Sequence, residues 1–183
     1  MKELLHVVGK DVVTQDAYIL GCVQDIRCED LNWSIVGLKV KSSSTVSGKL
    51  NMGSGRSMIM LEPEDFCIND VLLSGFTIDT IRSRITADDN GFLSVGSLEG
   101  MKVYASDAFL VGTVSDLVID YESWKVISMV IKIDKNAYAV LGIKKGLFAK
   151  KASGILMSHI EGISDTIVLG IDTDGVKSQL SLI

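Results

Sequence analysis

The stretch GKDVVTQDAYILGCVQDIRCEDLNWSIVGLKVK, residues 9–41, decides the fold, because the chain repeats it in the same register over residues 100–132. Identical residues recur at matching positions without a gap: Gly9, Val12, Asp16, Ala17, Gly21, Val23, Asp25, Trp33 and Lys41 in the first copy, and Gly100, Val103, Asp107, Ala108, Gly112, Val114, Asp116, Trp124 and Lys132 in the second. Other positions keep the chemical character of the side chain, as with Tyr18 in the first copy and Phe109 at the same position of the second. The sequence therefore predicts an internal duplication in which one physical template holds both halves.

Each copy of this stretch predicts a β-hairpin. In the first copy, residues 22–29 form the outgoing strand, residues 30–32 reverse the chain, and residues 33–41 return as a strand rich in β-branched and aromatic side chains. Trp33 and Trp124 are expected at equivalent positions on the return strands. We favour hairpin packing for both tryptophans, and as exposed aromatic side chains they would instead mark an interface with a partner.

The two halves differ outside the repeated stretch. Residues 42–57, SSSTVSGKLNMGSGRS, are rich in Ser and Gly and predict a flexible loop. Residues 63–67 predict one helical turn, because a proline begins it and acidic residues follow. The second half has a longer and more structured segment over residues 134–154, with a helical turn expected over residues 137–141 and ended by Gly142.

These elements predict an all-β fold of two small, mostly antiparallel β-barrels in tandem, each with a short helical turn. Closing a sheet of short strands into a barrel protects strand edges that would otherwise be exposed. The polar stretch over residues 86–91 ends in glycine and predicts the domain boundary, which gives a first domain of residues 1–88 and a second of residues 89–183.

The overall composition excludes several classes of protein. With 47% hydrophobic and 22% charged residues, the chain is expected to fold. A net charge of −5 disfavours a general nucleic-acid binder, since phosphate binding needs clustered lysine and arginine. The apolar runs are far shorter than the ~20 residues that span a bilayer, and residues 1–5 lack the apolar core of a signal peptide. We expect a cytoplasmic protein that reaches a membrane only through a partner.

The cysteines and histidines do not indicate a disulfide framework, a metal site or a catalytic site. The three cysteines are odd in number and form no CxxC pair, so neither a disulfide framework nor a zinc site is indicated. His6 and His159 do not occupy equivalent places in the two copies, and no G-x-S-x-G motif is present. The glycines near residues 47–57 do not complete a phosphate-binding loop, because Leu50 follows Gly48-Lys49 where Ser or Thr is needed.

Asp25 and Asp116 sit at equivalent positions in the two copies. A carboxylate there could serve acid-base catalysis or a metal. No histidine or second carboxylate accompanies either one in motif spacing, so we favour a structural role, accepting backbone hydrogen bonds. We predict no catalytic residue, no metal ligand and no cofactor, and hence a protein that is not an enzyme.

One loop of the second half is basic although the protein is acidic. It contains Lys144, Lys145, Lys150 and Lys151. A solvated loop is the default interpretation, and an acidic protein partner, an anionic lipid surface or RNA are the alternatives. With Trp33 and Trp124, these lysines are the candidate partner-binding residues.

The ordered set of motifs resembles the PRC-barrel domain, a family named after the H subunit of photosynthetic reaction centres and found as the C-terminal half of the ribosome maturation factor RimM. The matching residues of the first copy are Gly9, Lys10, Val12, Gly21, Val23, Asp25, Pro63, Ile68, Asp70, Val71, Leu72 and Leu73. Those of the second copy are Gly100, Val103, Gly112, Val114, Asp116, Ile163, Asp165, Ile167, Val168 and Leu169. The second copy departs from the pattern with Ser158 in place of Pro63, and residues 141–145 look like a loop common in stand-alone archaeal members.

The resemblance implies a function. Stand-alone archaeal PRC-barrel proteins look like components of the tubulin-like cell-division ring, where they bind the membrane-tethered ring anchor and one another. We therefore expect a non-enzymatic adaptor, a homo- or hetero-dimer with protein partners, with no direct membrane insertion. The alternative is a ribosome maturation or RNA-processing factor like RimM, although RimM's separate N-terminal barrel is replaced here by a second PRC-like copy.

Overall fold

The computed structural model describes residues 2–3, 7–42, 44–50, 57–61, 66–86, 91–143 and 153–180. The chain divides into two compact units. Unit 1 consists of Met1–Gly96 with Asp120–Lys125, and unit 2 of Ser97–Ile119 with Val126–Ile183. The predicted boundary after residue 88 falls on residues 87–90, which lie outside the described residues.

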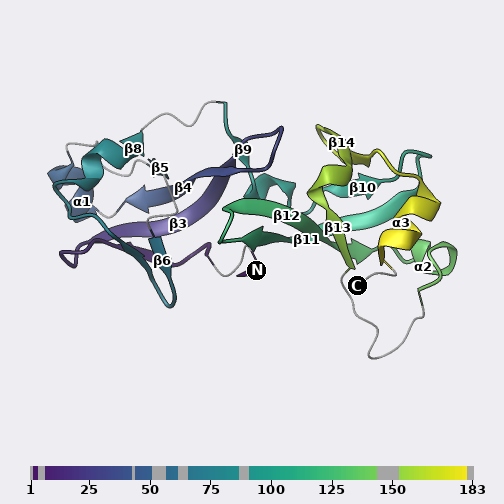
Figure 1. Ribbon diagram of the computed structural model, residues 1–183, viewed down its shortest axis with the longest axis horizontal. Helices are drawn as coiled ribbons and strands as arrows, with labels where there is room; N and C mark the ends of the chain where they lie inside the picture. The colour runs from purple at the N-terminus through teal and green to yellow at the C-terminus, as the bar shows by residue number, and fades with distance from the viewer. Residues whose placement is uncertain are drawn as a thin grey trace. The chain divides into compact units, whose positions relative to one another are not determined.

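Unit 1 is built on one twisted sheet whose path runs β6-β7-β2-β3-β4-β5-β8, with β9 paired to β3 (Figure 1). The strands are β2 (Asp11–Val13), β3 (Ile19–Cys28), β4 (Ile35–Ser42), β5 (Ser57–Leu61), β6 (Phe66–Ile68), β7 (Leu72–Ser74), β8 (Ile85–Thr86) and β9 (Leu93–Ser94). The short N-terminal β1 (Lys2–Glu3) is not part of this sheet. Neighbours on this path are antiparallel except β2 and β7, which run parallel. Alternate residues such as Val12, Leu20 and Leu72 are fully buried and form the core.

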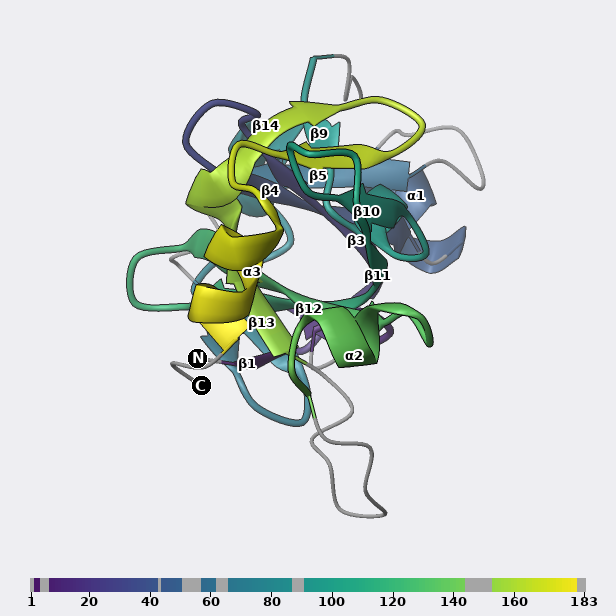
Figure 2. The same cartoon turned by 90° about the vertical axis from the view of Figure 1, so that its right-hand side faces the viewer.

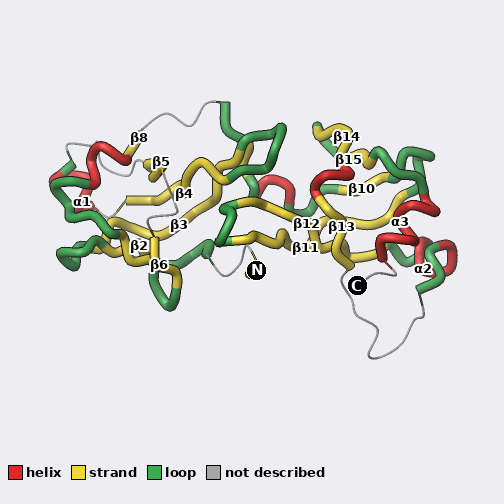
Figure 3. Tube along the Cα trace, in the orientation of Figure 1, coloured by secondary structure: helices red, strands yellow, loops and turns green. Residues whose placement is uncertain are grey.

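Unit 2 repeats this plan in the sheet order β13-β12-β11-β10-β15-β14. Its strands are β10 (Lys102–Tyr104), β11 (Leu110–Asp120), β12 (Lys125–Ile133), β13 (Ser153–Leu156), β14 (Ile160–Ile163) and β15 (Ile167–Leu169). The pair β10 and β15 is parallel, as β2 and β7 are in unit 1. Strands dominate both units (Figure 3). The predicted all-β fold is confirmed.

The repeat extends to individual backbone angles. Non-glycine residues with positive φ come in equivalent pairs, Ala17 (66°) with Ala108 (62°) and Trp33 (62°) with Trp124 (48°). A left-handed angle is uncommon for any residue with a side chain. Its recurrence at matched positions shows that the same turns are built twice.

Two glycines allow the long hairpin strands to approach closely. A Cβ atom added at Gly21 would lie 1.8 Å from the carbonyl oxygen of Lys41, and one added at Gly112 would lie 2.3 Å from the carbonyl oxygen of Lys132. No side chain can be accommodated at such distances without a shift of the paired strand. These glycines are therefore required by the close backbone contact inside each hairpin.

The tryptophans are not on the return strands, and that prediction was wrong. β4 begins at Ile35 and β12 at Lys125, so Trp33 and Trp124 are the left-handed residues that end each hairpin turn. The N–H of Trp33 donates to the carbonyl oxygen of Glu29 at 3.1 Å. A short hairpin loop often needs a left-handed residue to close it, and this requirement overrides the strand preference of an aromatic side chain.

The helices are short and partly unexpected. They are α1 (Ser44–Lys49), α2 (Ala137–Val140), α3 (Thr173–Leu180) and the 3-10 turns η3 (Ile81–Arg84), η4 (Gly96–Leu98) and η5 (Met157–His159). The predicted turn over residues 137–141 is confirmed by α2, with Gly142 at φ 70° after it. In Figure 2, α3 lies beside β13, which it contacts.

Two predictions for unit 1 were wrong. Helix α1 occupies part of the stretch predicted as a flexible loop, because Val46 and Leu50 are spaced to share one helical face and are both buried. Phe66 and Cys67, predicted at the end of a helical turn, lie on β6 and pair with β7. The rest of that predicted turn, residues 63–65, lies outside the described residues.

Candidate interaction surface

Asp25 holds the chain segment that follows β8 against β3 within unit 1. Its Oδ1 atom accepts the N–H groups of Ile26 and Gly96, each at 2.8 Å. Its Oδ2 atom accepts Nη1 of Arg27 at 2.7 Å and Oγ of Ser94 at 2.5 Å. Both oxygens are thus engaged by donors, and the predicted structural role of this carboxylate is confirmed.

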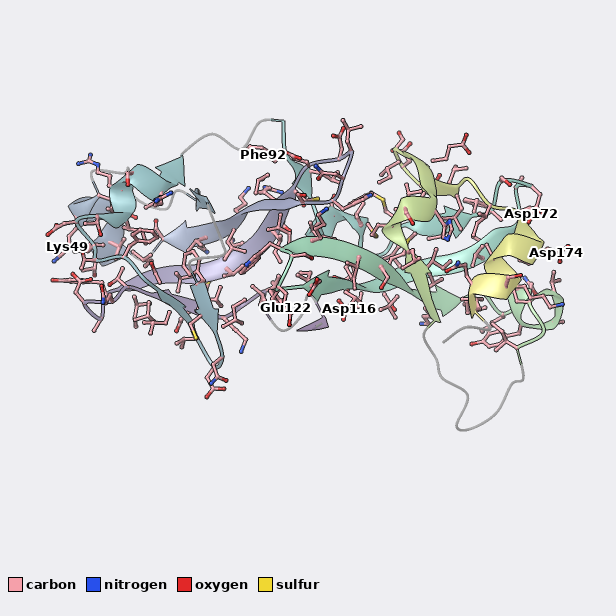
Figure 4. The ribbon with its side chains drawn as sticks, in the orientation of Figure 1. Lys49, Phe92, Asp116, Glu122, Asp172 and Asp174 are labelled. Carbon is pink, nitrogen blue, oxygen red and sulfur yellow. The ribbon has the colours of Figure 1, made fainter. Side chains whose placement is uncertain are left out.

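Asp116 also accepts a backbone hydrogen bond. It is buried on β11, and its Oδ1 atom accepts the N–H of Leu117 at 2.7 Å (Figure 4). In the described part of the chain, no cluster of three or more His, Cys, Asp or Glu side chains could hold a metal ion. Each of the two equivalent aspartates thus accepts the N–H of the residue that follows it.

A second pair of equivalent carboxylates ties the first turn of each unit to its last segment. Asp16 accepts the N–H of Ile78 at 3.0 Å, and Asp107 accepts the hydroxyl of Thr173 at 2.7 Å, at the start of α3. The Thr173 hydroxyl lowers the pKa of Asp107 below its ordinary value of 3.8, and the Thr14 hydroxyl lowers the pKa of Asp16 in the same direction. Both carboxyl groups are solvent-exposed, so these bonds position segments rather than form a reactive centre.

The three thiols differ in their surroundings. Cys28 is buried, and burial raises the pKa of its thiol to about 12, which leaves it unreactive at neutral pH. Cys67 is exposed on the edge strand β6. It belongs to an unusual row of outward side chains.

The outer row of unit 1 consists of Cys67, Leu73, Val13 and Ile19. They lie on β6, β7, β2 and β3 and are direct cross-strand partners in that order, so their side chains share one face of the sheet. That face points away from the core. Leu73 is 47% exposed and Ile19 53% exposed, while their strand neighbours Leu72 and Leu20 are fully buried.

Unit 2 carries the equivalent outer row, made of Gly162, Val168, Tyr104 and Leu110. The same cross-strand pairing joins them over β14, β15, β10 and β11. Val168 is 39% exposed, and Tyr104 and Leu110 are half-buried. A contiguous exposed apolar surface, present once in each unit, is typical of a binding site.

Among the described residues, one charged residue borders each outer row. Asp11 lies two residues before Val13 on β2, and Lys102 lies two residues before Tyr104 on β10, so each shares the face of its row. Both are exposed. The border position is acidic in unit 1 and basic in unit 2, although the two positions are equivalent in the repeat.

The predicted partner-binding residues lie elsewhere. Trp33 is buried, and Trp124 is half-buried with its ring 5.3 Å from that of Tyr121 in an edge-on arrangement. The four lysines fall on residues 144–152, which lie outside the described residues. Partner binding by all six residues stays a prediction.

Sequence reasoning missed the outer rows. Alternation along each strand was visible, but no single strand contributes more than one residue to a row. The rows exist only through the parallel pairing of β2 with β7 and of β10 with β15, which joins segments far apart in the chain. The repeat itself was the available signal, since apolar residues stand at both Val13 and Tyr104 and at both Ile19 and Leu110.

The fold and this surface define a β-sheet protein with two like units, each presenting an apolar row. Residues 90–174 match the family model of the PRC-barrel domain. The second half of the chain is thus a PRC-barrel domain. In the first half, the N–H of Gly9 donates to Val23 O at 2.8 Å, as that of Gly100 does to Val114 O at 2.9 Å. Membership of the first half in the same family stays a prediction.

Other comparisons add little. Among solved structures, the chain is similar to a putative 16S ribosomal RNA processing protein, RimM, from Pseudomonas aeruginosa, with 17% identity, a TM-score of 0.31, and coverage of 92% of this chain and 98% of that chain. A likeness this weak carries no argument about function. No curated protein matches this chain. Within the described residues, no helix is both long and apolar enough to cross a membrane.

Proposed function

We propose that this protein is a non-enzymatic adaptor that binds protein partners through its outer rows. The observation that carries the proposal is the presence of an exposed apolar row at the same place in both units. Apolar side chains on a free sheet face gain free energy when a partner removes them from water, at roughly 25 cal/mol per Å². A surface repeated twice is suited to joining two molecules.

The partner we propose is a component of the tubulin-like division ring in the cytoplasm, either the membrane-tethered ring anchor or another PRC-barrel protein. This choice rests on the PRC-barrel domain of residues 90–174 and on the resemblance to stand-alone archaeal members. The net charge of −5 supports a protein partner over ribosomal RNA.

The test is a titration of the purified protein with the cytosolic part of the ring anchor, followed by biolayer interferometry. We expect saturable binding that weakens about tenfold in Leu73→Ser or Val168→Ser, since each removes an exposed apolar contact from a row. Leu31→Ser is the matched control. Leu31 is 92% exposed on the turn between β3 and β4, away from the outer row, and its removal should leave the affinity unchanged.

Ribosomal subunits provide the opposing measurement. Sedimentation of the protein with ribosomal subunits at moderate salt, together with no binding to the ring anchor, would overturn the adaptor proposal in favour of ribosome maturation. Equal loss of anchor binding in the Leu31 variant and the row variants would show that the outer rows are not the binding surface.

A further inference from the structure

The two outer rows differ in the charge at their border, and this difference distinguishes the ways in which two copies could meet. Contact between two unit 1 faces would bring Asp11 near its own copy, and contact between two unit 2 faces would bring Lys102 near its own copy. Contact between a unit 1 face and a unit 2 face instead brings Asp11 near Lys102. Like charges that lose solvent at an interface disfavour association, and opposite charges fix its register.

The sizes of the row side chains favour the same mixed contact. Suppose that the unit 1 row of one copy faces the unit 2 row of the other and that the two rows run in opposite directions. The large side chain of Ile19 then lies opposite Gly162, which has no side chain, and the small Cys67 lies opposite Leu110. A Cβ added at Gly162 would have no neighbour within 4 Å, so the space over it is open. Large side chains opposite small ones give closer packing than rows of equal size.

The remaining charges on these faces do not oppose this arrangement. Lys41 pairs with Cys22 on β3, which in turn pairs with Asp11, and Lys132 stands at the equivalent position of the repeat. With the rows in opposite directions, these lysines stand at the two ends of the contact. The position that discriminates is therefore the pair Asp11 and Lys102.

We infer that the outer row of unit 1 in one copy of the chain docks on the outer row of unit 2 in a second copy. This inference rests on the proposed function, because it names one partner of the same surfaces. Such a contact joins unlike surfaces. Two copies can make it twice and close as a dimer, or make it once and leave one row of each kind for further copies, which gives larger rings or open chains.

The experiment is sedimentation of the purified full chain at low salt, from about 5 µM to about 500 µM, a range suited to a small interface. We expect the average mass to rise with concentration from that of the monomer to that of a dimer or a larger assembly. Asp11→Lys and Lys102→Asp should each weaken association about tenfold, because each creates like charges at the contact.

Exchanging the charges of residues 11 and 102 tests whether these two residues meet at the contact. The double variant Asp11→Lys with Lys102→Asp should associate as the wild type does, and an equimolar mixture of the two single variants should associate where each alone does not. Sedimentation as a monomer at every concentration would overturn the inference. No recovery in the double variant would also overturn it.

Thiol labelling locates the contact. Cys67 lies in the unit 1 row, and Gly162→Cys places an equivalent thiol in the unit 2 row at a position with open space. Both thiols should label more slowly as the concentration rises, in the wild-type background but not with Asp11→Lys. Cys28 stays silent because burial raises the pKa of its thiol to about 12, and the half-buried Cys22 is replaced by Ser in every sample. A labelling rate independent of concentration at both sites would contradict the inference, and anchor binding that persists in that case would leave the adaptor proposal intact.

Discussion

The two repeated hairpins share their backbone and differ in what their side chains hold. β3–β4 and β11–β12 each close with a left-handed tryptophan and each cross a glycine where the strands come close. In the first hairpin, however, Asp25 binds Arg27, Ser94 and Gly96, while among the described residues of the second, Asp116 binds the N–H of its neighbour Leu117. The backbone template depends on a few positions where geometry allows little choice, and the side chains around it have diverged.

The largest effect on stability is expected from substitutions that disturb the backbone of the repeated hairpins. Gly21→Ala should lower the free energy of unfolding of unit 1 by about 4 kcal/mol, and Gly112→Ala that of unit 2 by about 3 kcal/mol, because the added methyl group collides with a paired carbonyl. The smaller gap, 1.8 Å against 2.3 Å, and the φ of 154° make Gly21 the more sensitive site. Hydrogen exchange read peptide by peptide measures each unit separately.

Gly48→Ala is the matched control. Gly48 lies in α1, and a Cβ there would have no neighbour within 4 Å. Alanine should stabilise this helix by roughly 0.5–1 kcal/mol. Equal tolerance of alanine at all three glycines would show that the hairpin strands are not held as closely as described.

A smaller and more unequal effect is expected at the aspartates. Asp25→Ala removes four hydrogen bonds, one of which is the ion pair to the buried Arg27, so we expect a loss of about 3 kcal/mol in unit 1. Asp116→Ala leaves the buried N–H of Leu117 without this acceptor and should cost about 1–2 kcal/mol in unit 2. Urea unfolding combined with hydrogen exchange of residues 93–96 would distinguish the loss of stability in unit 1 from that in unit 2.

Asp25→Asn serves as the control for charge. It keeps an acceptor for the N–H groups of Ile26 and Gly96 but gives up the charge that pairs with Arg27, so its cost should fall between those of the wild type and Asp25→Ala. A loss of equal size at Asp25 and Asp116 would contradict the expectation that the bonds of Asp25 to Arg27, Ser94 and Gly96 add to the stability of unit 1.

Local signals explain what the sequence could predict. The reversal at residues 30–32 and the end of α2 at Gly142 depend on neighbouring residues, and both are seen in the structure. Helix α1 could not be predicted because its serine and glycine composition is typical of a loop. The helix depends on the burial of Val46 and Leu50. Tertiary packing overrode local composition there.

The outer rows could not be predicted for a different physical reason. Their residues become neighbours through strand register between distant segments, as with Val13 and Leu73. The exchange of Asp11 for Lys102 was visible in the aligned copies, but its place on the same face as the row depends on where β2 and β10 lie in their sheets. Register is set by the assembled core and not by any short pattern.

The smallest effect concerns the exposed carboxylates that tie each turn to the end of its unit. The pKa of Asp107 is lowered by the Thr173 hydroxyl, whereas that of Asp16 is lowered mainly by Thr14 in its own turn. A carboxyl whose folded pKa lies below its unfolded value stabilises the fold above the unfolded pKa, and this contribution is lost as pH falls through the folded pKa. Acid should therefore loosen the start of α3 in unit 2 more than the matching segment in unit 1.

Amide chemical shifts of Thr173 and Ile78 followed by NMR from neutral pH down to acid test this difference. Both amides donate to these carboxylates, so both should titrate with a midpoint below 3.8, and the Thr173 shift should be the larger because its hydroxyl donates as well. Asp107→Asn should abolish the transition at Thr173 and leave that at Ile78 in place. A midpoint above 3.8 at Thr173 would mean that the protonated carboxyl is the better partner, and would place the link between α3 and the first turn of unit 2 in other contacts.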